Sequence, residues 1–116
     1  MKRPEQSLQI ACVKWFRLQY PNSRICAIPN SAKRGVVEGA MFKAQGVSAG
    51  YPDLQILHNG KVYFIEMKSD KGRLSDSQKE WQTWLTENGF EHYVCNSFDS
   101  FKEIVDLILR KPSPIN

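Results

Sequence analysis

The sequence predicts a single α/β domain in which a mixed central sheet is flanked by helices. Three observations lead to this fold class: apolar residues at helical spacing near both ends, a β-hairpin signal in the middle, and a capped helix after the hairpin. The 116 residues are 41% hydrophobic, which is enough for one core of ordinary size. We expect one domain over residues 1–110 and a loose tail over 111–116.

The expected elements alternate between helices and strands. In chain order they are a helix over 4–20, a strand over 25–28, a helix over 36–45, strands over 54–57 and 62–67, a helix over 75–89, a strand over 92–95 and a helix over 98–109. In the first helix, Leu8, Cys12 and Trp15 mark an inward stripe. The prediction widens this stripe with three more apolar residues, Ile10, Val13 and Leu18.

Charge and cysteine usage limit the kind of protein. There are 16 Lys and Arg against 12 Asp and Glu, a net charge of +4 that makes a nucleic-acid partner worth considering. Cys12, Cys26 and Cys95 each lie in an apolar segment without close pairing, so we expect buried free thiols in a reducing compartment. Without a signal peptide or a membrane-length apolar run, we expect a soluble intracellular protein.

A hairpin signal places two carboxylates side by side. Asn59-Gly60 between two apolar runs is the strongest short-range indication of a two-residue turn. With this turn the register brings Asp53 opposite Glu66, where Cβ atoms are about 5 Å apart and like charges are destabilising. Strand alternation sends Lys68 to the face of Glu66. The three side chains should therefore converge.

Two carboxylates in one place need to be neutralised, and a hard divalent cation such as Mg²⁺ or Mn²⁺ suits their oxygens. In the alternative without a functional site, Asp53 caps a strand while Glu66 and Lys68 form a solvated ion pair. The apolar run over 62–65 indicates a covered central strand and favours a functional site at its end.

These residues resemble the core motif of the PD-(D/E)XK nucleases and, within them, the virus-type replication-repair nuclease (VRR-NUC) domain. The resemblance is carried by Pro52-Asp53, by Glu66-Met67-Lys68, by the Gly-rich approach over 46–54 and by the Ser-x-x-Gln helix start over 74–78. It extends from Glu5 to the last strand. It implies a restriction-endonuclease-like fold, with a mixed central sheet flanked by helices.

The resemblance also implies roles for single residues. Asp53, Glu66 and the Met67 backbone carbonyl would hold Mg²⁺ or Mn²⁺, and an acidic residue of the first helix, here Glu5, would join them. For Glu5 the alternative is a favourable contact with the helix dipole. Gln78 would be a catalytic neighbour of Lys68 or the attacking water, but a capping box with Ser75 explains the same residue and both roles can coexist.

The implied activity is metal-dependent endonucleolytic hydrolysis of DNA. Lys68 would act as a base or, as we prefer, stabilise the negative charge of the transition state. Five cations near the site are candidates for phosphate contacts, or ordinary surface charges: Lys33, Arg34, Lys43, Lys71 and Arg73.

Stand-alone domains of this kind resemble phage-borne enzymes that act as dimers on branched DNA. The expected protein is accordingly a homodimeric DNA-repair-type endonuclease for Holliday-junction-like or flap substrates, in the cytoplasm of a bacterial or phage-infected cell. The alternatives are a non-catalytic DNA-binding module on the same fold, a small interaction protein, and a nuclease without structure preference.

Overall fold

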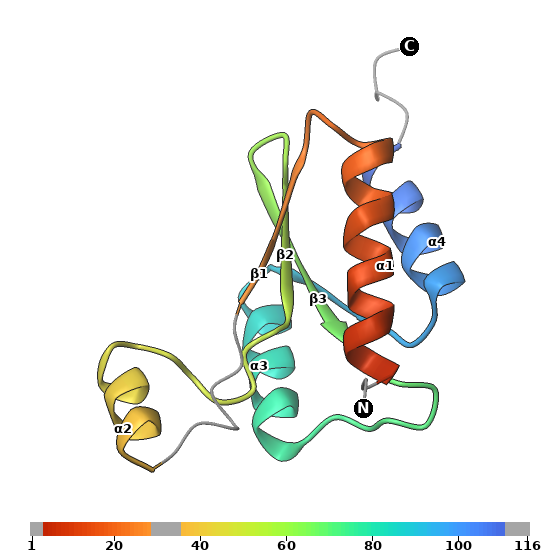
Figure 1. The fold of residues 1–116 in the computed structure, drawn as a ribbon. Coiled ribbons are helices and arrows are strands. Elements are labelled where there is room, and N and C mark those ends of the chain that lie inside the picture. The colour runs from red at the N-terminus through yellow and green to blue at the C-terminus, as the bar shows by residue number, and fades with distance from the viewer. Residues whose placement is uncertain (1–3, 29–35, 111–116) are drawn as a thin grey trace.

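A computed structural model describes residues 4–28 and 36–110 (Figure 1). The elements follow the predicted order and are α1 (Pro4–Gln19), β1 (Arg24–Ala27), α2 (Val36–Ala44), β2 (Leu54–His58), β3 (Lys61–Met67), α3 (Asp76–Glu87), β4 (Glu91–Cys95) and α4 (Phe98–Leu109). The sheet order is β1-β2-β3-β4, with antiparallel pairing except between β3 and β4, which are parallel. The mixed α/β class is therefore confirmed. The expected tail over 111–116 lies outside the described residues.

The central hairpin has the predicted turn and register. Asn59 and Gly60 both have positive φ angles, 49° and 78°, as a type I′ turn requires. His58 pairs with Lys61, and the ladder runs without a slip to Leu54 opposite Ile65. The turn therefore sets which residues of β2 and β3 share a face.

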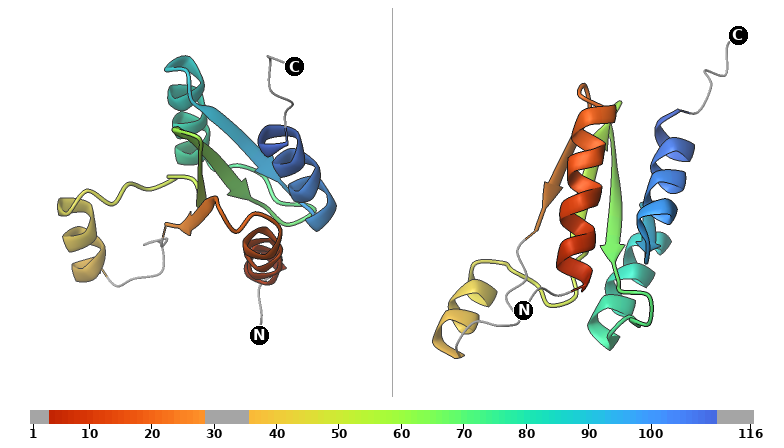
Figure 2. Two further views of the ribbon diagram at one scale, coloured as in Figure 1. Left: turned by 90° about the horizontal axis from the view of Figure 1, so that it is seen from above. Right: turned by 45° about the vertical axis from the view of Figure 1, so that its right-hand side comes forward.

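The sheet separates two helical layers. Helices α1 and α4 lie side by side on one face and α3 covers the other (Figure 2). The main core fills the α1/α4 side, where β3 contributes Tyr63, Ile65 and Met67. The alternate residues of β3, Phe64 and Glu66, point to the α3 side. Strand β3 is buried over most of its length, as expected of a central strand.

The predicted inward stripe of α1 was too wide. Cys12 is fully buried, and so is Phe16, which the prediction left out. Ile10 and Leu18 are 64% and 71% exposed. The reason is geometric: α1 contacts its neighbours along one side, and residues spaced by four share that side whereas Ile10 and Leu18 project away from it.

The cysteines divide in the same way. Cys12 and Cys95 are fully buried free thiols, but Cys26 is exposed, contrary to expectation. Cys26 lies in β1, a strand at the edge of the sheet, in which Ile25 is the residue that faces the core. An apolar sequence in a strand therefore does not mean that every residue of the strand is buried.

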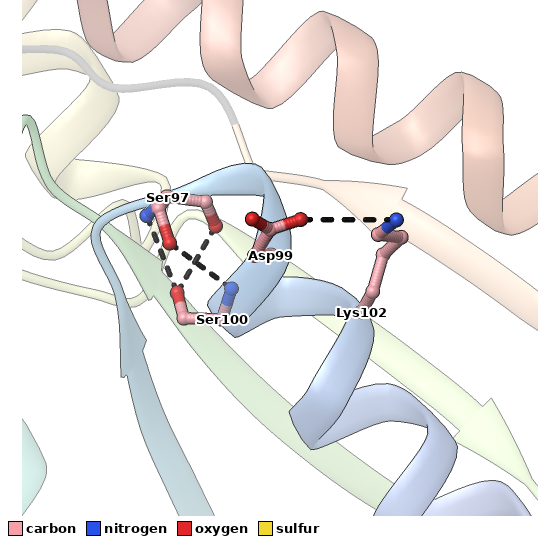
Figure 3. A network of polar contacts seen from close by, with 4 residues as sticks. All are labelled: Ser97, Asp99, Ser100 and Lys102. Atoms are coloured by element: carbon pink, nitrogen blue, oxygen red, sulfur yellow. Dashed lines mark hydrogen bonds and ion pairs between the residues drawn. The ribbon is translucent and has the colours of Figure 1, made fainter.

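Two helices begin with capping boxes. In α4, the Ser97 Oγ accepts from the Ser100 N–H at 3.0 Å, and the Ser100 Oγ approaches the Ser97 N–H at 3.2 Å (Figure 3). The nearby Asp99–Lys102 ion pair, at 3.8 Å, is solvent-exposed and contributes little to stability. Helix α3 has the predicted box between Ser75 and Gln78.

Helix α2 lies away from the sheet (Figure 1), and Met41 on it is 60% exposed. None of the described helices is long and apolar enough to cross a membrane.

Candidate active site

Asp53 directly precedes β2, at the edge of the sheet where β1 and β3 end. Its backbone carbonyl accepts a hydrogen bond from the Ile28 N–H at 2.9 Å, which extends the β1 ladder by one step. Its Oδ2 accepts from the Met67 N–H at 2.8 Å, across the hairpin. Asp53 is thus the cross-strand neighbour of the last residues of β3, as the register predicts. This bond also caps the end of β3. The capping role that was the alternative for Asp53 is therefore present together with its proximity to Glu66.

Among the described residues, Glu66 is the one charged side chain in the core, at 1% exposure. A solvated Glu66–Lys68 pair is therefore wrong. Burial first, then a hydrogen bond and the charge of Asp53, raise the pKa of Glu66 to about 9. Its Oε1 has no hydrogen-bond partner within the described chain. The surroundings of Glu66 therefore disfavour its ionised form, and one of its oxygens is available to bind a ligand.

Gln78 serves two purposes at once. Its Oε1 accepts from the Ser75 N–H at 2.8 Å, which completes the capping box of α3. Its Nε2 donates to Glu66 Oε2 at 3.1 Å. The two interpretations of Gln78 therefore coexist, because the two ends of one amide point to different partners.

Lys68 lies one step past the end of β3 and is half-buried. Its N–H donates to the Cys95 carbonyl at 2.9 Å, so the parallel pairing with β4 continues to this residue. The ammonium group acts against the other causes and lowers the pKa of Glu66. Lys68 is thus electrostatically coupled to the carboxyl pair, as strand alternation predicts.

Glu5 has the smallest electrostatic effect on Glu66 among the predicted site residues that act on it. Its charge raises the pKa of Glu66, as the last of the causes that act on that carboxyl. Over the described residues, no three His, Cys, Asp or Glu side chains come together as a metal-binding cluster. Glu5 belongs to α1, which packs on the face of the sheet lined by Tyr63, Ile65 and Met67. The oxygen pair that could hold a cation is that of Asp53 and Glu66.

Three of the five predicted phosphate-binding residues lie in the described part of the chain. Lys71 and Arg73 are exposed in the connection between β3 and α3, directly after Lys68. Lys43 is exposed in the last turn of α2. Lys33 and Arg34 lie outside the described residues.

The packing of the loop before Asp53 was not predicted from the sequence. Tyr51 sits with its ring centroid 4.9 Å from that of Trp81 on α3, and its hydroxyl accepts from Gln55 Nε2 at 2.6 Å. Gly50 has a positive φ of 82° and touches the start of α3. The Gly-rich composition of the loop was a signal for a close approach, but it did not say to which element.

Comparison with known proteins gives one consistent answer. The family model described as the VRR-NUC domain matches residues 3–99. A solved structure of a VRR-NUC domain protein superposes with a TM-score of 0.77 at 24% identity, covering 95% of this chain and 91% of that one. Another, a VRR-NUC domain, has a TM-score of 0.65 at 16% identity, with 90% and 97% coverage. No curated protein matches the chain.

The structural likenesses establish the fold, and the family model extends over most of the chain, including the hairpin, Lys68 and Gln78. The chain therefore belongs to the VRR-NUC domain family, and its function is of the nuclease type.

Proposed function

We propose that the protein is a metal-dependent endonuclease that hydrolyses DNA phosphodiester bonds at the Asp53–Glu66–Lys68 site. One observation carries the proposal: the Glu66 carboxyl is buried beside Asp53 with its Oε1 unpartnered. Leaving a buried polar atom unpaired destabilises a protein by about 1–3 kcal/mol. A ligand that satisfies this oxygen would account for such an arrangement.

A hard divalent cation fits these residues. Mg²⁺ is commonly held by one or two carboxylates, with water and substrate oxygens completing the octahedron, so a cluster of three acidic side chains is not required. Asp53, Glu66 and the Met67 carbonyl would hold Mg²⁺ or Mn²⁺, and Glu5 would join if α1 and the sheet end approach further. When bound, the ion would polarise a phosphate oxygen and lower the pKa of a water molecule.

The chain's own groups would do the remaining work. The Lys68 ammonium group would lie against the phosphate and offset the negative charge that grows in the transition state. Gln78 would fix the orientation of Glu66, since its amide is itself held by the Ser75 cap. Asp53 would keep its position through its bond from the Met67 N–H.

We propose branched duplex DNA as the substrate and a homodimer as the working form. Lys71 and Arg73 would contact phosphates beside the site, and Lys43, Lys33 and Arg34 are the further candidates for phosphate contacts. The exposed position of α2, away from the sheet, supports a surface that a second protomer would cover. A two-fold dimer would present two cleavage sites to a symmetric junction.

A non-catalytic DNA-binding module has no use for this carboxyl pair. A buried carboxyl with an unpartnered oxygen lowers stability, so a protein that only bound DNA would gain from replacing Glu66. A nuclease without structure preference would use the same site. Only its choice of DNA substrates would distinguish it from the proposed enzyme.

The decisive experiment is cleavage of four-way junction, flap, linear duplex and single-stranded DNA with Mg²⁺, Mn²⁺ or EDTA. Glu66→Gln and Lys68→Ala should abolish cutting while the protein stays folded and binds DNA. Glu103→Gln and Lys61→Ala change exposed residues of the same types and should cut normally. Activity that survives chelation, or full activity of either site variant, would contradict the proposal. Equal rates on all duplex substrates would favour the nuclease without structure preference.

A further inference from the structure

The loop over residues 46–52 makes direct backbone contact with the first turn of α3. A Cβ built on Gly50 would lie 2.4 Å from the carbonyl carbon of Ser77, 2.5 Å from its oxygen and 2.7 Å from the Gln78 nitrogen. These neighbours are backbone atoms, which cannot swing aside as the tip of a side chain can. Glycine is therefore needed here for space as well as for its positive φ of 82°.

The two segments that meet at this contact each continue to a residue that acts on Glu66. On the helix side, Gln78 donates to Glu66 Oε2 at 3.1 Å. On the loop side, Asp53 follows Gly50 by three residues and lies close enough to Glu66 to raise the pKa of that carboxyl. The same close approach thus sets the distance between two side chains, Gln78 and Asp53, that both act on the Glu66 carboxyl.

The loop is also clamped immediately after Gly50. The Tyr51 ring packs edge-on against Trp81 and against Phe64, with centroids 4.9 Å and 5.9 Å apart. Its hydroxyl is fixed by Gln55 on β2. Phe64 and Gln55 hold Tyr51 to the sheet, and the Met67 N–H holds Asp53, so a collision at Gly50 would be relieved mainly by moving the start of α3.

We propose that Gly50 is a positioning residue of the nuclease site, whose missing side chain allows α3 to approach until Gln78 reaches Glu66. This inference rests on the function proposed above. Ordinary contact begins at 3.4 Å, so an added methyl group would displace the helix start by roughly 1 Å. The Gln78–Glu66 bond of 3.1 Å would then be lost.

Gly46 provides a matched control. It also has a positive φ, 102°, but nothing lies within 4 Å of a Cβ built there. Gly50→Ala and Gly46→Ala therefore share the conformational cost, and the first alone adds the collision. We expect Gly50→Ala to lower kcat by about tenfold to a hundredfold with KM changed less than about twofold, and Gly46→Ala to leave both near the wild type. Equal losses in the two variants would overturn the proposal.

A double mutant tests whether Gly50 acts through Gln78. If it does, Gly50→Ala should have no further effect on kcat in a Gln78→Ala background, because the bond is already absent. A loss of the same factor in both backgrounds would show that Gly50 acts by another route.

A second readout does not depend on cleavage. The side-chain amide signals of Gln78 in a ¹⁵N-correlated NMR spectrum, assigned by their loss in Gln78→Ala, should shift in Gly50→Ala and stay in place in Gly46→Ala. Unchanged signals in Gly50→Ala would refute the inference. If the wild type cuts no DNA, the proposed function fails while this spectrum still decides the role of Gly50.

Should Gly50→Ala not fold, Tyr51→Leu loosens the same loop without touching residue 50. It removes the ring that packs on Trp81 and keeps an apolar side chain in its place. The Gln78 signals should move as in Gly50→Ala, and kcat should fall. Wild-type spectra and rates in Tyr51→Leu would contradict the coupling between loop and helix.

Discussion

The Nε2 of Gln78 donates a hydrogen bond to Oε2 of Glu66 at 3.1 Å, while Oε1 of the same glutamine accepts from the Ser75 N–H. A helix cap is thus connected to a buried carboxyl by one side chain. Stability of α3 and orientation of the site become linked, and variants can separate the two.

Ser75→Ala and Gln78→Ala should differ in activity more than in stability. Each removes part of the α3 cap, and losing such a cap destabilises a protein by about 1 kcal/mol. Ser75→Ala leaves the Gln78 amide able to reach Glu66, so kcat should stay near the wild type, whereas Gln78→Ala should lower it by about tenfold or more. Thermal unfolding and initial rates measure the two effects. An equal drop in kcat for both variants would mean that only the cap matters.

Glu66→Gln should stabilise the metal-free protein at neutral pH. Folding raises the pKa of Glu66 from its ordinary 4.5 to about 9. The folded state therefore keeps a proton that the unfolded chain releases above pH 4.5, and stability falls as pH rises towards 9. In EDTA at pH 7 the neutral amide should gain about 1–3 kcal/mol over the wild type. Urea unfolding at several pH values tests this, since the gain should vanish near pH 4.

Lys71→Ala and Arg73→Ala should weaken DNA binding without slowing the chemical step. Both side chains are exposed beside the site, where each would neutralise one phosphate. Each variant should flatten the dependence of log K on log salt by about one unit, with kcat at saturating DNA unchanged. Lys61→Ala, at the far end of the hairpin, is the control. A salt dependence identical to that of the wild type would remove these residues from the interface.

One thiol should react in the native protein and three after unfolding. Cys26 is exposed, whereas burial raises the pKa of Cys12 to about 11 and that of Cys95 to about 12. A thiol reagent attacks the thiolate, so Cys26 should be labelled first at pH 8. Mass spectrometry with and without denaturant counts the labels. Rapid native labelling of Cys12 would contradict the packing of α1.

Phe16→Ala should destabilise the protein far more than Leu18→Ala. Phe16 is fully buried against the sheet, so its truncation should lower the free energy of unfolding by about 3–5 kcal/mol. Leu18 is 71% exposed, and its truncation should stay within about 0.5 kcal/mol. Chemical denaturation of the two variants compares them directly. Similar losses would restore the wider inward stripe that the sequence predicts.

Local chemistry explains what could be predicted from the sequence. Asn59-Gly60 determines a turn by its backbone preferences alone, and the register then places Asp53 near Glu66 by simple counting. The capping box of α3 is equally local. In contrast, whether Phe16 or Leu18 faces inward depends on where α4 packs, and the exposure of Cys26 depends on β1 being an edge strand.

The same limit applies to the site. The distance between Glu5 and the carboxyl pair depends on how α1 crosses the sheet, which no spacing in the sequence encodes. The contact of Gly50 with α3 joins segments on either side of the hairpin, so composition could suggest a close approach without naming the partner. Lys33 and Arg34 lie outside the described residues, and their roles stay predictions.

The locality of the hairpin has a consequence for the order of folding. A two-residue turn closes within microseconds, so Asp53 and Glu66 meet while water still surrounds both. Helix α3 has to pack on the sheet and bring β4 into place beside β3. This step is slower because its contacts are less local. Dehydration of Glu66, and with it proton uptake from neutral solution, should therefore accompany the late docking of α3. A pH indicator in stopped-flow refolding would time that event.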